Sequence, residues 1–84
     1  MLYVTMTDRF MSGWGLAEGK INKLVFECDD LKEARIVRNN ADDRKEMTYV
    51  NICSNKPCYN TSRYFTSLKT KSEAEPWYKE NFGR

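Results

Sequence analysis

Three cysteines are the residues of this chain best suited to nucleophilic or metal chemistry, but their spacing argues against a metal site. Cys53 and Cys58 are separated by four residues, wider than the two-residue spacing of zinc knuckles, and no histidine exists to complete a ligand set. An odd number of cysteines leaves one unpaired in any disulfide scheme, which fits a reducing compartment. We expect three free thiols without metal, with Cys28 and Cys53 as small buried side chains at the ends of two strands.

Groups that acid–base or covalent catalysis would require are absent or scattered. There is no histidine to serve as a general base, and no serine or cysteine has an activating partner that the sequence reveals. The acidic pairs Asp29-Asp30 and Asp42-Asp43 bracket a predicted helix, so roughly 16 Å would separate them, too far to share a magnesium ion. We expect a protein that is not an enzyme and that uses no cofactor.

The glycine-rich stretch of residues 12–20 matches neither of the two common phosphate-binding motifs. Its glycines are spaced G-x-G-x-x-x-G, one residue longer than the dinucleotide fingerprint, and they precede a strand instead of a helix. Ile21 follows Gly19-Lys20 at the position where a P-loop requires Ser or Thr. The stretch predicts a loop that carries Trp14, whose ring either covers an open edge of the core or is presented to a partner.

From Ser54 to Lys71 the chain contains no acidic residue, and basic and aromatic side chains are interleaved along it. Single-stranded nucleic-acid surfaces need cations for phosphates and rings for stacking, although lysines also protect an edge strand against aggregation. A nucleic-acid surface would use Lys56, Arg63, Lys69 and Lys71. A protein-binding surface would use aromatic and arginine anchors, namely Trp14, Tyr59, Arg63, Tyr64 and Trp77.

The central element of the expected fold is a strand, a helix and a strand within residues 22–53. Short β-branched and aromatic runs predict strands at Lys23–Cys28 and Met47–Cys53. Asp30 is expected to cap the helix between them, with Glu33 reaching back to the amide of the cap. An apolar stripe wide enough to cover one face of a sheet is formed by Leu31, Ala34, Val37 and Ala41.

Two further strands and a C-terminal element complete the expected fold. Alternating patterns predict strands at Leu2–Met6 and Ser62–Leu68, and Ser54–Asn60 reads as a turn, for which a hairpin is plausible. The tail from Ser72 to Arg84 predicts a short helix that begins at Ser72 or at Glu75, or else an extended lid. Such an aromatic tail either docks on the core or serves as a plug for a partner.

The composition predicts one small folded domain. With 84 residues, of which 40% are hydrophobic, the chain buries roughly 60 to 65% of the surface of its unfolded form. A net charge of +2 indicates neither a nucleic-acid binder nor an acidic mimic of one. No apolar run approaches the roughly 18 residues of a membrane span, and Met1–Phe10 lacks the features of a signal peptide. We therefore expect a soluble cytoplasmic protein with an α+β fold, in which one main helix from Leu31 to Ala41 covers a four-stranded sheet.

Several stretches resemble a known group of sequences over most of the chain. The stretches are Tyr3–Gly15, Ala17–Lys20 and Tyr49–Cys53. They are similar to small uncharacterised open reading frames found in bacteriophage genomes and gut viral sequence collections. That group has no established activity, so the resemblance implies a context and no site residues. Small phage proteins without enzymatic motifs commonly act on host machinery or on host defences.

Two functions are consistent with these observations. The first is a non-enzymatic accessory protein of phage type that binds a host protein in the cytoplasm of the host cell, as an inhibitor of a defence or nucleic-acid-processing complex. The alternative is a small protein that binds single-stranded nucleic acid through Ser54–Lys71. The sequence leaves open the identity of the target, the strand order and whether a homodimer completes the sheet through an edge strand.

Overall fold

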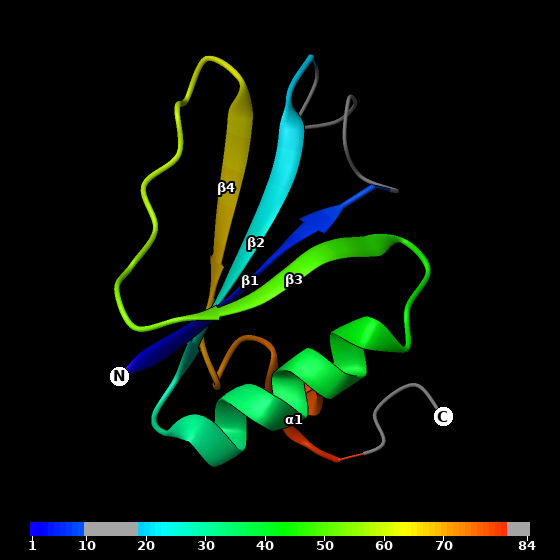
Figure 1. The fold of residues 1–84 in the computed structure, drawn as a ribbon, viewed down its shortest axis with the longest axis vertical. Helices are drawn as coiled ribbons and strands as arrows, with labels where there is room; N and C mark the ends of the chain where they lie inside the picture. Colours follow the sequence, from blue (N-terminus) through cyan, green and yellow to red (C-terminus); the bar gives the residue numbers. More distant parts are fainter. Residues whose placement is uncertain (10–18, 81–84) are drawn as a thin grey trace.

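In the computed structural model, which describes residues 1–9 and 19–80, a four-stranded mixed sheet packs against one helix of 12 residues (Figure 1). This is the expected α+β fold. The strand β3 coincides with the predicted run, whereas β1 ends two residues later and β2 starts two residues earlier than predicted. In chain order the elements are β1 (Leu2–Asp8), β2 (Ile21–Cys28), α1 (Leu31–Asp42), β3 (Met47–Cys53), β4 (Tyr64–Lys69) and the 3-10 helix η2 (Glu75–Tyr78).

The strand order of the sheet is β3-β1-β2-β4. β1 runs antiparallel to both of its neighbours, β2 and β3, and β4 pairs with β2 in parallel. β2 and β3 are therefore parallel to each other with β1 between them, and α1 connects them. This is the arrangement for which a right-handed crossover is expected.

The connection from β3 to β4 is not a hairpin, so that prediction was wrong. The two strands lie at opposite edges of the sheet, and residues 54–63 run from one edge to the other (Figure 1). The Ile21 amide donates a hydrogen bond of 2.9 Å to the backbone oxygen of Arg63, at the start of the parallel pairing between β2 and β4. Turn residues such as those of this segment mark where a strand ends, but they do not determine which strand the next one joins.

The N-terminus of α1 is capped by the predicted residue. The Asp30 Oδ1 accepts a hydrogen bond of 2.9 Å from the Glu33 amide. The Glu33 carboxylate accepts one of 3.0 Å from the amide of Asp29, and not from the cap residue as the sequence analysis expected. The capping box is therefore present with its second half displaced by one residue.

Three of the four residues in the predicted apolar stripe of α1 are buried. Ala34, Val37 and Ala41 are fully buried, whereas Leu31 is 45% exposed. Leu31 is the first residue of the helix, almost one turn before Ala34, where the helix first meets the core. Asn40, only 2% exposed, joins the buried face instead.

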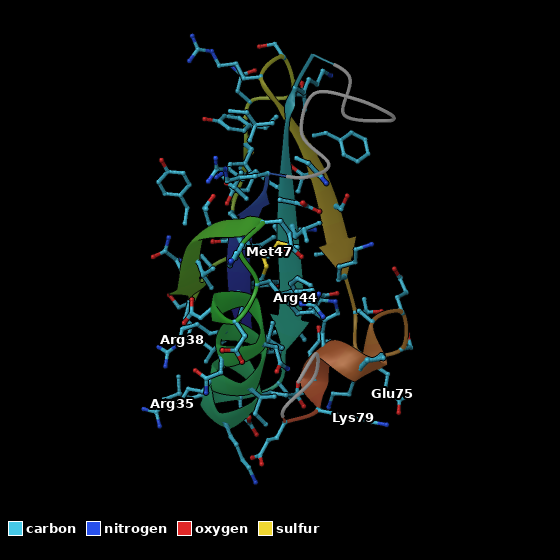
Figure 2. All side chains as sticks on the ribbon, turned by 90° about the vertical axis from the view of Figure 1, so that its right-hand side faces the viewer. Arg35, Arg38, Arg44, Met47, Glu75 and Lys79 are labelled. Carbon is cyan, nitrogen blue, oxygen red and sulfur yellow. The ribbon has the colours of Figure 1, made fainter. Side chains whose placement is uncertain are left out.

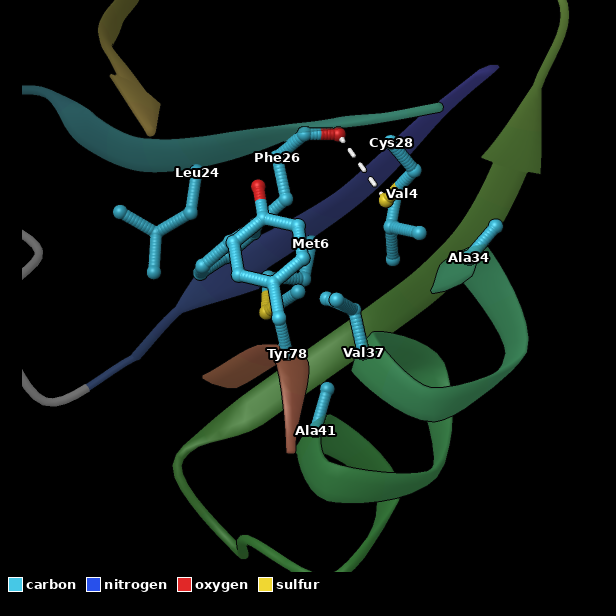
Figure 3. Packing of buried hydrophobic residues seen from close by; sticks show 9 residues of the cluster. All are labelled: Val4, Met6, Leu24, Phe26, Cys28, Ala34, Val37, Ala41 and Tyr78. Atoms are coloured by element: carbon cyan, nitrogen blue, oxygen red, sulfur yellow. Dashed lines mark hydrogen bonds between the residues drawn. The ribbon is translucent and has the colours of Figure 1, made fainter. Parts of the chain in front are cut away.

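The core lies between α1 and one face of the sheet (Figure 3). Val4 and Met6 of β1 and Phe26 of β2 are at most 1% exposed, and they pack against Val37 of α1. Each such side chain contributes about 1.5 to 3 kcal/mol when it is fully buried. Tyr78 of η2 closes the core beside Phe26, and its hydroxyl donates a hydrogen bond of 2.6 Å to the backbone oxygen of Glu27.

The C-terminal element begins at the later of the two predicted positions. The 3-10 helix η2 starts at Glu75, Ala74 precedes it without a side-chain cap, and Pro76 lies in its first turn. The side-chain amide of Asn40 donates hydrogen bonds to the backbone oxygens of Trp77 and Lys79. This segment is therefore docked on α1, and Figure 2 shows both at the same end of the molecule.

Candidate functional site

The face of the sheet opposite α1 carries a cluster of tyrosines around one lysine, which we call the tyrosine face. Leu24 and Phe26 of β2 face α1, so the alternation of side chains directs Lys23 to the other side. Lys23 pairs with Thr7 of β1 and with Thr66 of β4, and paired residues share one face of a sheet. The residues of the tyrosine face are Thr7, Lys23, Tyr49, Tyr59 and Tyr64.

The ammonium group of Lys23 lies among three tyrosine rings. Its Nζ is 5.5 Å from the ring centroids of Tyr49 and Tyr59 and 5.6 Å from that of Tyr64. The same nitrogen donates a hydrogen bond to the Thr7 hydroxyl. Burial lowers the pKa of Lys23 from its ordinary value, whereas the electron-rich ring faces favour the charged form. The centre of the tyrosine face is therefore a cation held by aromatic rings.

Tyr49 reaches the cluster through an irregularity in β3. The pairing of β1 with β3 shifts register between Thr5 and Thr7, and Tyr49 in this bulge has a φ of 55°. A residue with a side chain in this left-handed region costs about 1 to 3 kcal/mol. Tyr49 is nevertheless 76% exposed, so little of its ring contributes to the core. Strain that presents an exposed ring is typical of functional positions.

Tyr59 and Tyr64 come together because residues 54–63 run across to the far edge of the sheet. Tyr64 is the first residue of β4 and pairs with Ile21, whereas Tyr59 belongs to the connecting segment. Their ring centroids are 5.6 Å apart at an interplanar angle of 49°. Both are half-buried, whereas Tyr49 is the exposed ring of the cluster.

Charge is distributed unevenly between the two sides of the sheet. From Met47 to Ser72 the chain has no acidic residue, and this stretch supplies β3, the connecting segment and β4. Lys56 and Arg63 of the stretch are exposed, as is Arg9 just after β1. Most acidic residues of the described chain lie in or near α1 and η2, namely Asp29, Asp30, Glu33, Asp42, Asp43, Glu46, Glu73, Glu75 and Glu80.

The four cations predicted as a nucleic-acid surface do not form one surface. Lys71 forms ion pairs with Glu33 and with Asp29, the latter at 3.1 Å, and its hydrogen bonds to the two carboxylates raise its pKa. Lys69 pairs with Phe26 and therefore belongs to the side of the sheet that faces α1. Of the four, only Lys56 and Arg63 belong to residues 54–63, the connecting segment that carries Tyr59. The sequence shows the order of the charges along the chain, but not that the carboxylates of Asp29 and Glu33 lie beside Lys71 in space.

The predicted tryptophan anchor Trp77 is not part of the tyrosine face. Trp77 is half-buried, with its ring centroid 4.9 Å from that of Phe26 and 4.7 Å from the guanidinium carbon of Arg44. It therefore packs on the side of the sheet that α1 covers. Trp14 lies outside the described residues. Of the predicted protein-binding residues, Tyr59, Arg63 and Tyr64 are brought together.

Lys23 and Tyr49, which lie at the centre of the cluster, were not predicted as site residues from the sequence. Lys23 stands inside a strand pattern, and the alternation of that strand does place it opposite the core. Tyr49 also stands inside a strand pattern, and no residue type around it signals a bulge or a positive φ. The useful signal was the alternation in β2, which leaves a lysine at a position that faces away from the core.

An open cavity of about 640 Å³ lies beside the exposed ring. It is lined by Thr7, Arg9, Ile21, Thr48 and Tyr49. Cavities of a few hundred to about 1,000 Å³ are of the size that binds small ligands. Among the described residues that line it, Arg9 alone is charged.

The cysteines show three different environments. All three are free: Cys28 is buried, Cys53 is half-buried and Cys58 is exposed. The prediction of a buried side chain thus holds for Cys28 and fails for Cys53, which pairs with Tyr3 on the edge strand β3. Burial raises the pKa of the Cys28 thiol to about 12.

Among residues 1–9 and 19–80, no group of three or more cysteine or acidic side chains is arranged to hold a metal ion. Over the same residues, no helix has the length and apolar character that a membrane crossing requires.

Comparison of the chain with protein-family models, curated proteins and solved structures finds no match. A function is therefore inferred from the residues of the site.

Proposed function

We propose that the tyrosine face binds single-stranded nucleic acid. The observation that carries this proposal is the exposed ring of Tyr49 beside the Lys23 cation, within a surface whose strands β3 and β4 contain no acidic residue. Nucleic-acid surfaces of this kind combine aromatic rings, on which bases stack, with cations that follow the phosphates. The open face of a small sheet is a common platform for both.

The exposed cations around the cluster are suited to phosphates. Arg9 lines the cavity beside Tyr49, and Arg63 and Lys56 lie in or next to the segment that carries Tyr59. Within residues 1–9 and 19–80, none of the three forms an ion pair with a carboxylate in the way that Lys71 does with Glu33. Such contacts give affinity without sequence preference and make binding dependent on salt.

Lys23 has a different role in this proposal. Its Nζ is already held by the Thr7 hydroxyl and three rings, so it orients the tyrosines and adds positive potential beneath them. The absence of acidic side chains from β3 and β4 lets that potential reach an approaching phosphate.

The proposal is tested by fluorescence anisotropy with labelled single-stranded and duplex oligonucleotides of about 12 nucleotides. We expect the single strand to bind more tightly than the duplex, because stacked and paired bases offer no free face to Tyr49. The variant Lys56→Glu/Arg63→Glu should lose most of this binding. Its matched control is Lys32→Glu/Arg35→Glu, which changes the net charge equally at exposed positions of α1. Equal loss in both variants, or no binding by the unaltered protein, would reject the proposal.

A second candidate is the binding of a host protein as an inhibitor in the host cytoplasm. Tyr49 favours it too, because exposed tyrosines and arginines are the side chains that most often anchor protein interfaces. The resemblance to small phage reading frames also supports it. Capture from nuclease-treated host lysate separates the two: a protein retained by the unaltered chain and lost with Tyr49→Gly, without oligonucleotide binding, would favour this second function.

A further inference from the structure

The cavity beside Tyr49 combines three kinds of group that a single nucleotide needs. Its lining includes the exposed aromatic ring of Tyr49, the guanidinium of Arg9 and the hydroxyl-bearing side chains of Thr7 and Thr48. A ring offers a stacking surface for a base, a guanidinium pairs with a phosphate, and hydroxyls bond to a base edge or a sugar. Ile21 completes the wall with an apolar side chain that is 42% exposed.

Thr48 adds an observation of its own. Its side-chain oxygen is buried, and within the described part of the chain it has no hydrogen-bond partner. Buried hydroxyls in native proteins nearly always have a partner, so an unpaired one calls for an explanation. The neighbouring cavity supplies one, because a change of the Thr48 side-chain rotamer would turn this oxygen to the cavity, where a polar atom of a ligand would complete its bonding.

The conformation of Tyr49 explains how its ring comes to border this cavity. In a regular strand its side chain would alternate with those of Thr48 and Val50, whereas its φ of 55° at the bulge redirects it. Glycine, asparagine and aspartate adopt this backbone conformation most readily, yet the chain has a tyrosine there. The fold keeps this strained residue although its ring is 76% exposed, which points to a use for the ring outside the core.

We propose that this cavity is a subsite for one nucleotide unit of the strand, with the base stacked on Tyr49, the phosphate on Arg9 and a polar atom of the base or sugar on Thr48. This inference rests on the proposed function, and it adds where on the protein one nucleotide of the strand would bind. It also predicts that one defined nucleotide of a bound oligonucleotide is unstacked from its neighbours, whereas the others follow the remaining cations without a fixed place.

The test uses single-stranded oligonucleotides that carry one 2-aminopurine, a base whose fluorescence reports its stacking. Three variants of Tyr49 separate the ring from the backbone. Tyr49→Gly and Tyr49→Asn keep residues that accept the left-handed conformation but remove the ring, and Tyr49→Phe keeps the ring but removes the hydroxyl. We expect binding to weaken roughly 5- to 150-fold with glycine or asparagine and to stay near that of the unaltered protein with phenylalanine.

Arg9 is tested in the same titrations. Arg9→Ala should reduce the logarithmic salt slope by about 0.7, the value of one single-strand phosphate contact. Its matched control, Arg35→Ala, removes an exposed arginine from α1 and should leave the slope unchanged.

The possible results distinguish failure of the subsite from failure of the proposed function. If the unaltered protein binds oligonucleotides and the glycine and asparagine variants bind equally well with the same 2-aminopurine signal, the subsite is rejected while nucleic-acid binding stands. If the unaltered protein binds no oligonucleotide, the proposed function fails and the subsite fails with it. Loss of affinity and of the 2-aminopurine signal in the two ring-less variants alone supports the subsite.

Discussion

The side-chain amide of Asn40 on α1 donates a hydrogen bond of 2.8 Å to the backbone oxygen of Trp77, 37 residues further along the chain. The same amide donates one of 2.9 Å to the backbone oxygen of Lys79. Asn40 is only 2% exposed, so the donor of both bonds is buried. Because Tyr78 lies between the two accepting residues, this single side chain fixes the segment that closes the core beside Phe26.

Replacement of Asn40 by alanine should therefore destabilise the domain. Two backbone oxygens would lose their donor, which we expect to cost about 1 to 3 kcal/mol of unfolding free energy. Urea denaturation followed by circular dichroism measures this. The control Asn39→Ala changes an exposed neighbour on the same helix, and it should leave the midpoint nearly unchanged. Identical midpoints for the two variants would show that η2 docks without Asn40.

The face of α1 that packs on the sheet gives a second prediction. Val37→Asp should unfold the domain, because a buried carboxylate without a partner costs several kcal/mol out of a total of about 4 to 12 kcal/mol. Arg35→Asp should have little effect, since Arg35 is exposed and points away from the sheet (Figure 2). Thermal melts compare the two variants, and equal melting temperatures would contradict the packing described for this helix.

One part of the fold could be predicted from local patterns in the sequence. Local patterns identified β3 and the start of α1, because a run of β-branched residues and a capping aspartate act within a few residues. Pairing could not be predicted in this way. The pairing of β4 with β2 brings Tyr64 beside Ile21, which is far from it along the chain, and no short-range signal specifies this pairing.

The candidate site was predictable only in part for a similar reason. Tyr59, Arg63 and Tyr64 stood out because they occur in a stretch without acidic residues. Tyr49 lies beside them only because of the bulge in β3. Lys71 is not part of the site because it forms an ion pair with the carboxylate of Glu33. Both effects depend on long-range packing, which composition and spacing do not contain.

The thiols provide a third prediction, which includes a pH dependence. Burial raises the pKa of Cys28 from 9.0 to about 12, and the nearby carboxylate of Glu33 is the next cause. In the native protein at about pH 8, a thiol reagent should modify exposed Cys58 first and Cys28 only after unfolding. Mass spectrometry of partially modified protein identifies the sites. Rapid native modification of Cys28 would contradict its burial.

The raised pKa of Cys28 determines whether its titration raises or lowers the stability of the fold as the pH increases. The folded state holds this proton more tightly than the unfolded state, so the associated stability is complete below pH 9 and is lost as the pH rises from 9 towards 12. The raised pKa of Lys71 acts in the same direction, whereas the lowered pKa of Lys23 opposes it. Urea midpoints measured along this range should fall, and in a Cys28→Ala variant they should fall less.

A fourth prediction concerns the strained backbone of Tyr49. Tyr49→Gly keeps the left-handed backbone but removes its strain, which costs a residue with a side chain about 1 to 3 kcal/mol, and this gain offsets the entropy that glycine loses on folding. The unfolding free energy should therefore change by less than about 1 kcal/mol. The control Val50→Gly removes an adjacent side chain that packs on the core, and it should cost about 2 kcal/mol or more. A larger loss with Tyr49→Gly than with Val50→Gly would assign the ring a structural role.

The most direct test of the account is the salt dependence of single-stranded oligonucleotide binding. Arg9, Lys56 and Arg63 predict about three phosphate contacts, and hence a logarithmic slope of about −2 for the association constant against salt. The slope should be largely lost in Lys56→Glu/Arg63→Glu and retained in Lys32→Glu/Arg35→Glu. Binding that is absent at low salt, or a slope that is the same in both double variants, would contradict the assignment of nucleic-acid binding to the tyrosine face.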